Sequence, residues 1–200
     1  GPGTRPSNLG RHLQDRGLRR DVVVPGMAIE LAELDPIDRS DAIDSLDPID
    51  SSDPAPPGGP DSSITCERVF NQRQLGLWVE IFQRVFDLPA PVPELFLSGF
   101  GRLGFDQPNV RHYLATLAGE PVGCGSMFGV AGVAGIYNVA TLPQARGRGI
   151  GSLLVTRPLR QARELGYRIG ALHATEAGLN AYRRLGFRQV CEIERYLWSG

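Results

Sequence analysis

The segment Tyr137-Asn-Val-Ala-Thr-Leu-Pro-Gln-Ala-Arg-Gly-Arg-Gly-Ile-Gly151 joins an apolar strand to a helix that continues as Ser152-Leu-Leu-Val155. Its glycines, Gly147, Gly149 and Gly151, allow the loop to turn its backbone N–H groups toward one point. The first turn of the following helix adds N–H donors that have no partner inside the helix. The sequence therefore predicts an anion site here, best suited to a pyrophosphate.

The spacing of these glycines argues against two common nucleotide-binding motifs. It is not the Gly-x-Gly-x-x-Gly spacing of a dinucleotide fold, and no Gly-Lys-Ser/Thr follows as in a P-loop, so nucleotide binding is the weakest alternative. Arg146-x-x-Gly149-x-Gly151, preceded by Val139-x-x-x-Pro143, instead resembles the acyl-CoA-binding motif of the GNAT acetyltransferase superfamily. Downstream, Tyr182-Arg-Arg-Leu-Gly-Phe187 is similar to the Tyr-x-x-Leu-Gly-Phe signature of that family.

The chain is expected to have three parts: an N-terminal helix-strand segment (1–34), an acidic Pro-rich linker (35–63) and a GNAT-like acetyltransferase domain (64–200). In the linker, Asp35-Pro-Ile-Asp-Arg-Ser-Asp41 recurs as Asp47-Pro-Ile-Asp-Ser-Ser-Asp53. Residues 35–61 carry eight Asp against one Arg, a net charge of −7. Such a segment cannot bury enough apolar surface to offset the entropy that ordering would cost.

The N-terminal segment has two interpretations. Its pattern predicts a short helix within 9–18, stopped by Gly17, and strands over 21–24 and 27–31. Leu13-x-x-x-Gly17-Leu18 parallels Tyr182-x-x-x-Gly186-Phe187, which favours the remnant of a degenerate GNAT-like unit in a truncated chain. The alternative is an unrelated helix-strand arm that packs on the main domain.

Helical and strand patterns alternate along the predicted domain. Hydrophobic periodicity and turn residues predict strands at 64–70, 111–117, 122–130, 133–141, 168–173 and 190–198, and helices at 72–86, 93–100, 150–166 and 177–185. Pro158 should bend the third of these helices at a cost of about 3 kcal/mol. The predicted fold class is therefore α/β (α+β), a GNAT-like mixed, mostly antiparallel sheet flanked by helices, with an N-terminal helix-strand appendage.

The resemblance implies acetyl-CoA (coenzyme A) as cofactor. In the family, backbone groups of the strand before the loop pair with the pantetheine arm, and the loop and helix start hold the pyrophosphate. Carried over by motif, the cofactor-binding residues are Val139, Ala140, Thr141, Arg146, Gly147, Arg148, Gly149, Ile150, Gly151 and Ser152.

Tyr182 matches the tyrosine that donates a proton to the departing thiolate in many members of the family. A phenol of ordinary pKa, about 10, is protonated at neutral pH and suits that role. Without the family match, Tyr182 reads as a half-buried aromatic residue on an amphipathic helix. The family's common Asn, seven residues earlier, is replaced by Thr175, which leaves cofactor contact from that segment open.

A general base is harder to identify. Many members place a Glu on the strand before the loop, but residues 133–141 contain neither carboxylate nor histidine, and Tyr137 and Asn138 could at most orient a water. His173, at the end of the following strand, is the first candidate, followed by His112 and Glu120. A water relay, or an amine that arrives neutral, would need no base.

Composition narrows the partners and the compartment. No apolar run approaches the roughly 20 residues of a membrane span. Residues 62–200 carry fifteen Arg against ten acidic residues, or +5, which suits a polyanionic cofactor, but basic and aromatic residues do not interleave as in nucleic-acid-binding proteins. The three cysteines lack metal-site spacing, and their odd number argues against a disulfide framework. We therefore expect a cytoplasmic protein that binds no membrane, nucleic acid or metal.

The leading functional hypothesis is an N-acetyltransferase in which an amine attacks acetyl-CoA directly in a ternary complex. The acceptor is a small-molecule amine or a protein N-terminus, and a homodimer is among the assemblies left open. The aromatic residues of 72–107 form either an apolar acceptor wall or core. The alternative is a non-catalytic acyl-CoA-binding or protein-interaction module, since the base is missing.

Overall fold

The structure, a computed structural model, describes residues 6–34 and 63–198. The chain forms two compact units: a central unit, Glu30–Gly170, and a terminal unit that combines Gly1–Ile29 with Ala171–Gly200. Apart from Ser63, the predicted linker lies outside the described residues. The proposed domain boundaries at 34 and 63 stay predictions.

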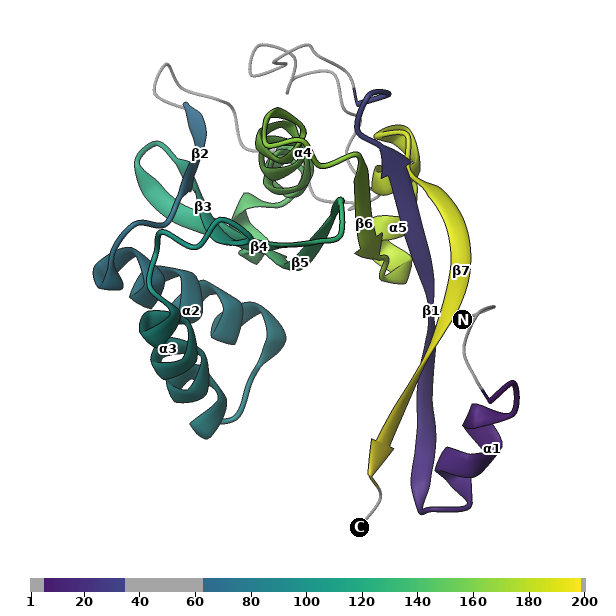
Figure 1. The fold of residues 1–200 in the computed structure, drawn as a ribbon. Helices are drawn as coiled ribbons and strands as arrows, with labels where there is room; N and C mark the ends of the chain where they lie inside the picture. Colours follow the sequence, from purple (N-terminus) through teal and green to yellow (C-terminus); the bar gives the residue numbers. More distant parts are fainter. Residues whose placement is uncertain (1–5, 35–62, 199–200) are drawn as a thin grey trace. The chain divides into compact units, whose positions relative to one another are not determined.

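Four antiparallel strands form the sheet of the central unit (Figure 1). They are β2 (Ile64–Arg68), β3 (Val110–Leu117), β4 (Glu120–Val130) and β5 (Val133–Thr141). Two-residue turns join the last three, with φ of 51° and 82° at Ala118 and Gly119 and of 49° and 80° at Ala131 and Gly132. Positive φ at both positions matches the right-handed twist of paired strands, so these turns hold β3, β4 and β5 in one meander.

Helices cover both faces of this sheet (Figure 1). On one side lie α2 (Gln72–Phe86) and α3 (Pro91–Leu103), and on the other lies α4 (Ile150–Glu164). Neighbouring side chains of β3 point to opposite faces of the sheet. The ring of His112 lies 5.4 Å from that of Trp78 on α2, whereas the Tyr113 hydroxyl donates to Gln161 of α4 at 2.8 Å. Successive side chains of a strand point to opposite faces, so β3 contributes to both layers.

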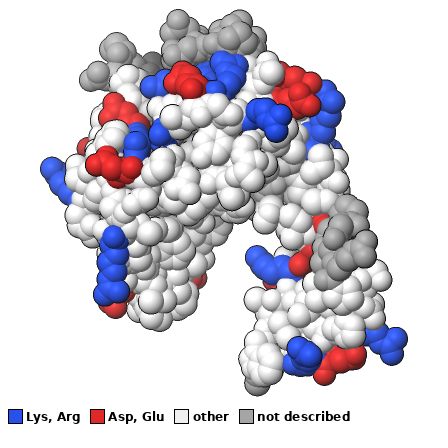
Figure 2. All heavy atoms as spheres, viewed as in Figure 1, with Lys and Arg blue, Asp and Glu red and all other residues white. Residues whose placement is uncertain are grey.

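Trp78 is the centre of the packing between α2, α3 and the sheet. It is fully buried, and its indole N–H donates to the Gly125 carbonyl at 2.9 Å. Its ring lies 6.0 Å from Phe96 and 5.8 Å from Phe100. The aromatic residues of 72–107 therefore form mainly core, although Phe86 stays 47% exposed. Figure 2 shows few charged side chains over α2 and α3.

The terminal unit is built on two long paired strands. In it, β1 (Leu18–Glu30) runs antiparallel to β7 (Arg188–Trp198), from Leu18 opposite Trp198 to Ala28 opposite Arg188. The two strands predicted at 21–24 and 27–31 are thus one strand through Pro25 and Gly26. A Cβ at Gly26 would lie 2.5 Å from Cys191 Sγ, so glycine permits this pairing. The remaining elements are α1 (Leu9–Gln14), shorter than predicted, β6 (Ile169–His173), which begins in the central unit, and α5 (Glu176–Arg184).

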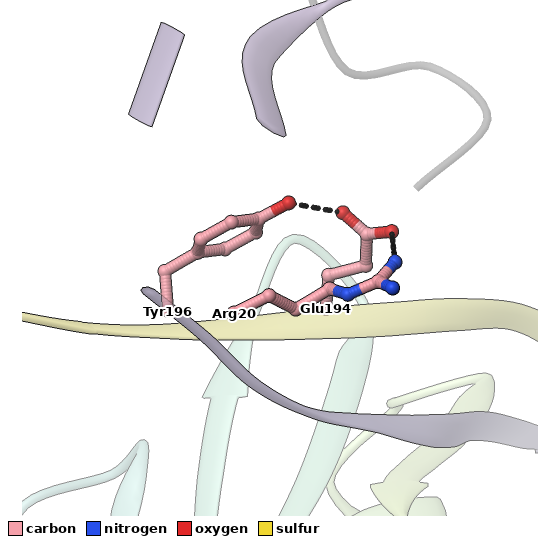
Figure 3. A network of polar contacts seen from close by, with 3 residues as sticks. All are labelled: Arg20, Glu194 and Tyr196. Atoms are coloured by element: carbon pink, nitrogen blue, oxygen red, sulfur yellow. Dashed lines mark hydrogen bonds and ion pairs between the residues drawn. The ribbon is translucent and has the colours of Figure 1, made fainter. Parts of the chain in front are cut away.

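A small polar network ties β1 to β7 near their outer ends (Figure 3). Arg20 donates to one oxygen of Glu194 at 3.2 Å, and the Tyr196 hydroxyl donates to the other at 2.7 Å. These two hydrogen bonds lower the pKa of Glu194. Because Arg20 and Glu194 are exposed and Tyr196 is only partly buried, the network helps to set strand register more than it stabilises the fold.

The predicted fold class is confirmed: the described residues form five α-helices and seven strands of a mixed, mostly antiparallel α/β structure. Pro158 lies inside α4, which does not end there. Across residues 6–34 and 63–198, none of the helices has the length and apolar character needed to cross a membrane.

Candidate functional site

The candidate site is the turn between β5 and α4 in the central unit. A short 3₁₀ turn, η2 (Pro143–Ala145), follows β5, and Gly147 and Gly149 then adopt φ of 75° and 73°. Side-chain-bearing residues rarely adopt such a φ. Among the described residues, none lies within 4 Å of where a Cβ of Gly147 would stand, so backbone conformation, not space, calls for glycine there.

The start of α4 supplies donors for an anion. Gly149 is its N-cap, no side chain caps the helix, and its first turn contains no acidic residue. The backbone N–H of Leu153 bonds to the Gly149 carbonyl at 3.0 Å. The N–H groups of Ile150, Gly151 and Ser152 therefore precede the helical ladder and project from a helix end with positive partial charge. These donors suit an anion such as a pyrophosphate, and the predicted cofactor-binding role of these residues stays a prediction.

A β-bulge lies beside the predicted pantetheine-binding residues. Tyr137 is opposite Ser126 and Ala140 is opposite Cys124, so Asn138 and Val139 together face one residue of β4. Asn138 has a φ of 57°, which asparagine tolerates better than most residues. A bulge interrupts the regular ladder of backbone hydrogen bonds at that point. The sequence analysis did not predict this bulge, whose one sign in the sequence is an Asn in a mainly apolar strand.

The two arginines of the loop differ in their contacts. Arg146 Nε donates to the Thr141 carbonyl at 3.2 Å, which fastens the loop to the end of β5. Arg148, between the two positive-φ glycines, is partly exposed. Both guanidinium groups stand in the turn, where charge-assisted hydrogen bonds to a phosphate are strong. The predicted cofactor-binding residues thus form one continuous structural feature.

Tyr182 and His173 both belong to the terminal unit, and their predicted catalytic roles stay predictions. Tyr182 is half-buried on α5, with its ring 6.1 Å from that of Phe187. Burial raises the pKa of the Tyr182 phenol, so it is protonated at neutral pH. Thr175 Oγ1 accepts from the Gly178 N–H at 3.3 Å, so this residue, in place of the family's Asn, is the N-cap of α5. His173 is exposed at the end of β6.

His112, one of the other base candidates, is a core residue. It is 6% exposed, and its Nδ1 lies 2.8 Å from Ser126 Oγ, its cross-strand partner. Its ring lies 4.1 Å from that of Phe100. Burial, together with the charge of Arg68, lowers the pKa of His112 to about 4, so its imidazole is neutral at pH 7. Glu120 is exposed in the turn between β3 and β4.

The two buried cysteines lack the character of nucleophiles. Burial raises the pKa of Cys66 to about 12 and raises that of Cys124 further. A reactive cysteine needs its thiolate form at neutral pH. These thiols are packing residues.

Comparison with known proteins adds an independent finding. The model of the acetyltransferase (GNAT) family matches residues 77–187, a stretch that includes both the Arg-Gly turn and the Tyr182–Phe187 motif. No curated protein matches the chain.

Several solved structures share the fold. A GCN5-related N-acetyltransferase from Kribbella flavida matches with a TM-score of 0.65 and 20% identity, covering 97% of this chain and 65% of its own. One from Sphaerobacter thermophilus has a TM-score of 0.64 and 22% identity, covering 95% and 55%. A predicted acetyltransferase from Clostridium acetobutylicum, solved with acetyl-CoA, has a TM-score of 0.54 and 18% identity, covering 64% and 91%. The chain thus spans less than two thirds of the length of the first two structures.

Proposed function

Because this chain belongs to the acetyltransferase (GNAT) family, we propose that it binds acetyl-CoA and transfers the acetyl group to an amine. The turn between β5 and α4 carries the proposal. It combines two positive-φ glycines, an uncapped helix N-terminus free of acidic residues, and two arginines. Each of these features favours a bound polyphosphate.

Different residues of β5 and the turn bind different parts of the cofactor. Bound acetyl-CoA supplies the activated thioester. Val139, Ala140 and Thr141 hold the pantetheine arm through backbone groups next to the bulge at Asn138. The pyrophosphate rests on Arg146, Gly147, Arg148, Gly149, Ile150, Gly151 and Ser152.

Tyr182 is the proposed general acid. Its phenol donates its proton to the sulfur that leaves when the C–S bond breaks and the new C–N bond forms. The attacking amine is neutral, and its nitrogen loses a proton once the C–N bond has formed. That proton restores the phenol, either through water or through His173. Because burial raises the pKa of Tyr182, the phenol is protonated at neutral pH and can donate to the leaving sulfur.

A second candidate function is acyl-CoA binding without catalysis. In its favour, residues 133–141 contain no carboxylate or histidine. His112, on β3 of the same sheet, is buried and neutral. Such a module would bind the cofactor and leave it intact.

An acetylation assay separates the two candidates. The full chain is incubated with acetyl-CoA and a panel of small amines and peptides with free N-termini, and released CoA thiol is measured. An enzyme releases CoA only with its acceptor, and acetylated product accumulates in equal amount. Saturable binding with no release across the panel favours the module. We propose a small-molecule amine or a protein N-terminus as acceptor, and the cytoplasm as the compartment.

A further inference from the structure

A second cationic pocket lies in the central unit, away from the residues of the Arg-Gly turn. Its volume is about 400 Å³, and β2, β3 and α4 line it. Three arginines contribute, Arg68 from β2, Arg111 from β3 and Arg157 from α4. Figure 2 shows charged side chains of both signs over the region of β2 and α4.

The register of the strands explains why these arginines meet. Arg68 is the cross-strand partner of Tyr113, and Arg111 stands two residues before Tyr113, so all three point to the same face of the sheet. The hydroxyl of Tyr113 donates to Gln161, which identifies this face as the one that α4 covers. Arg157 stands four residues before Gln161 and therefore projects from the same side of the helix.

The guanidinium groups of the pocket are incompletely satisfied. The Nε atoms of Arg68 and Arg111 are buried and have no hydrogen-bond partner among the described residues. An Nη2 of Arg68 donates to the Phe105 carbonyl, and the Arg68 guanidinium lies 5.1 Å from the centre of the Phe70 ring. Burial and the neighbouring charge of Arg111 lower the pKa of Arg68. Two like charges are therefore held close together on a partly buried surface.

Two carboxylates also line the pocket but do not neutralise it. Glu164 follows Arg157 by seven residues on α4, at the end of the helix. Glu67 is the cross-strand partner of Leu114, a core residue of the opposite face, so its side chain alternates away from Arg68. Among the described residues that line the pocket, guanidinium groups outnumber carboxylates three to two, and the charge of Asp106 also acts on Arg68.

We propose that the pocket formed by Arg68, Arg111 and Arg157 binds a phosphate group. A phosphate near neutral pH carries a charge close to −2 and offers several strong acceptor oxygens, so it can satisfy guanidinium groups from more than one strand. A single carboxylate, with one charge and two oxygens, would leave part of this set unpaired. The proposal does not depend on the acetyl-CoA site, because no residue of 137–152 lines this pocket.

Calorimetric titration tests the proposal, with inorganic phosphate and glycerol 3-phosphate added to the full chain at constant ionic strength. Arg111→Gln and Arg157→Gln should each weaken phosphate affinity at least about tenfold, the loss expected for one charge-assisted hydrogen bond. The matched control Arg102→Gln, at an exposed position of α3 outside both sites, should bind within about twofold of the wild type. Arg148→Gln reports any phosphate that binds at the Arg-Gly turn instead. Of the two ligands, the one that binds tighter identifies the source of the phosphate.

Arg157 is exposed, so Arg157→Gln should fold even if Arg111→Gln does not. Phosphate should then raise the melting temperature of Arg102→Gln more than that of Arg157→Gln. The proposal is overturned if neither ligand binds at tens of millimolar, or if only Arg148→Gln weakens binding. If the chain binds phosphate in this pocket but does not bind acetyl-CoA, the proposed function is overturned and the proposal for the pocket stands.

Discussion

Arg146 donates a hydrogen bond from Nε to the carbonyl oxygen of Thr141, at 3.2 Å. The bond closes the Arg-Gly turn onto the end of β5, so the turn is partly ordered before any ligand arrives. Arg146→Lys keeps the charge but loses the Nε–H, and it should weaken acetyl-CoA affinity about tenfold, roughly the worth of one such bond. Arg183→Lys, on exposed α5, is the matched control for calorimetry. Equal affinity in wild type and Arg146→Lys would mean that only the charge matters.

Gly147 and Gly76 offer a matched pair for the backbone argument. At both positions a Cβ would have no neighbour within 4 Å in the part of the chain that the structure describes, but Gly147 has a φ of 75° while Gly76 lies inside α2. Gly147→Ala should lower the free energy of unfolding by about 1 to 2 kcal/mol. Gly76→Ala should raise it by about 0.5 to 1 kcal/mol, because alanine favours a helix. Urea unfolding measures both, and equal effects of the same sign would contradict the strained-turn interpretation.

Tyr182→Phe tests the proposed acid. The variant removes the hydroxyl but keeps the ring against Phe187, so folding should be little changed. We expect kcat to fall about tenfold to a hundredfold or more, as for loss of a general acid, with acetyl-CoA affinity within about twofold of the wild type. An unchanged kcat would remove Tyr182 from the mechanism, and a matching loss of affinity would make it a binding residue instead.

His112 should make the fold sensitive to mild acid. Its pKa is lowered from 6.5 to about 4 in the folded chain, chiefly by burial. Between these values the unfolded chain takes up a proton that the folded chain does not, so stability is lost as the pH falls through this window. By pH 4.5 the loss should reach about 2 to 3 kcal/mol.

His112→Gln provides the reference for that experiment, because it cannot titrate. Urea unfolding at pH 7 and pH 4.5 measures how much unfolding free energy each protein loses between the two pH values. The contributions of the other titrating groups largely cancel when these two losses are compared. The wild type should lose more stability than the variant. Parallel losses in the two proteins would show that His112 is not protonated selectively in the unfolded chain.

Local patterns were enough to predict the turn and most elements. Glycines at alternate positions after an apolar strand predicted the loop, and the two-residue turns at 118–119 and 131–132 fall where Ala-Gly pairs interrupt the apolar runs. Helix α2 matches its predicted bounds of 72–86, because Asn71 caps it and Asp87, with a φ of 49°, ends it. These features depend on residues close in sequence.

What escaped prediction depends on distant residues. The bulge at Asn138 arises from the register of β5 against β4, and the continuity of β1 through Pro25 from its pairing with β7. Helix α4 continues through Pro158, as the sequence predicts, but the contact that α4 makes with β4 at this point was not predicted. The Pro158 ring leaves the Leu154 carbonyl without its helical donor. The Leu154 oxygen would lie 3.6 Å from a Cβ at Gly125, so α4 packs against β4 at a glycine. Hydrophobic periodicity carries no information about such contacts.

The central claim is that the turn between β5 and α4 holds acetyl-CoA, and calorimetric titration of acetyl-CoA into the full chain tests it most directly. We predict saturable binding of one molecule per chain, which inorganic pyrophosphate competes away and which Gly149→Ala weakens by about tenfold, since that residue has a φ of 73°. No saturable heat at millimolar acetyl-CoA, or equal binding by wild type and Gly149→Ala, would contradict the account.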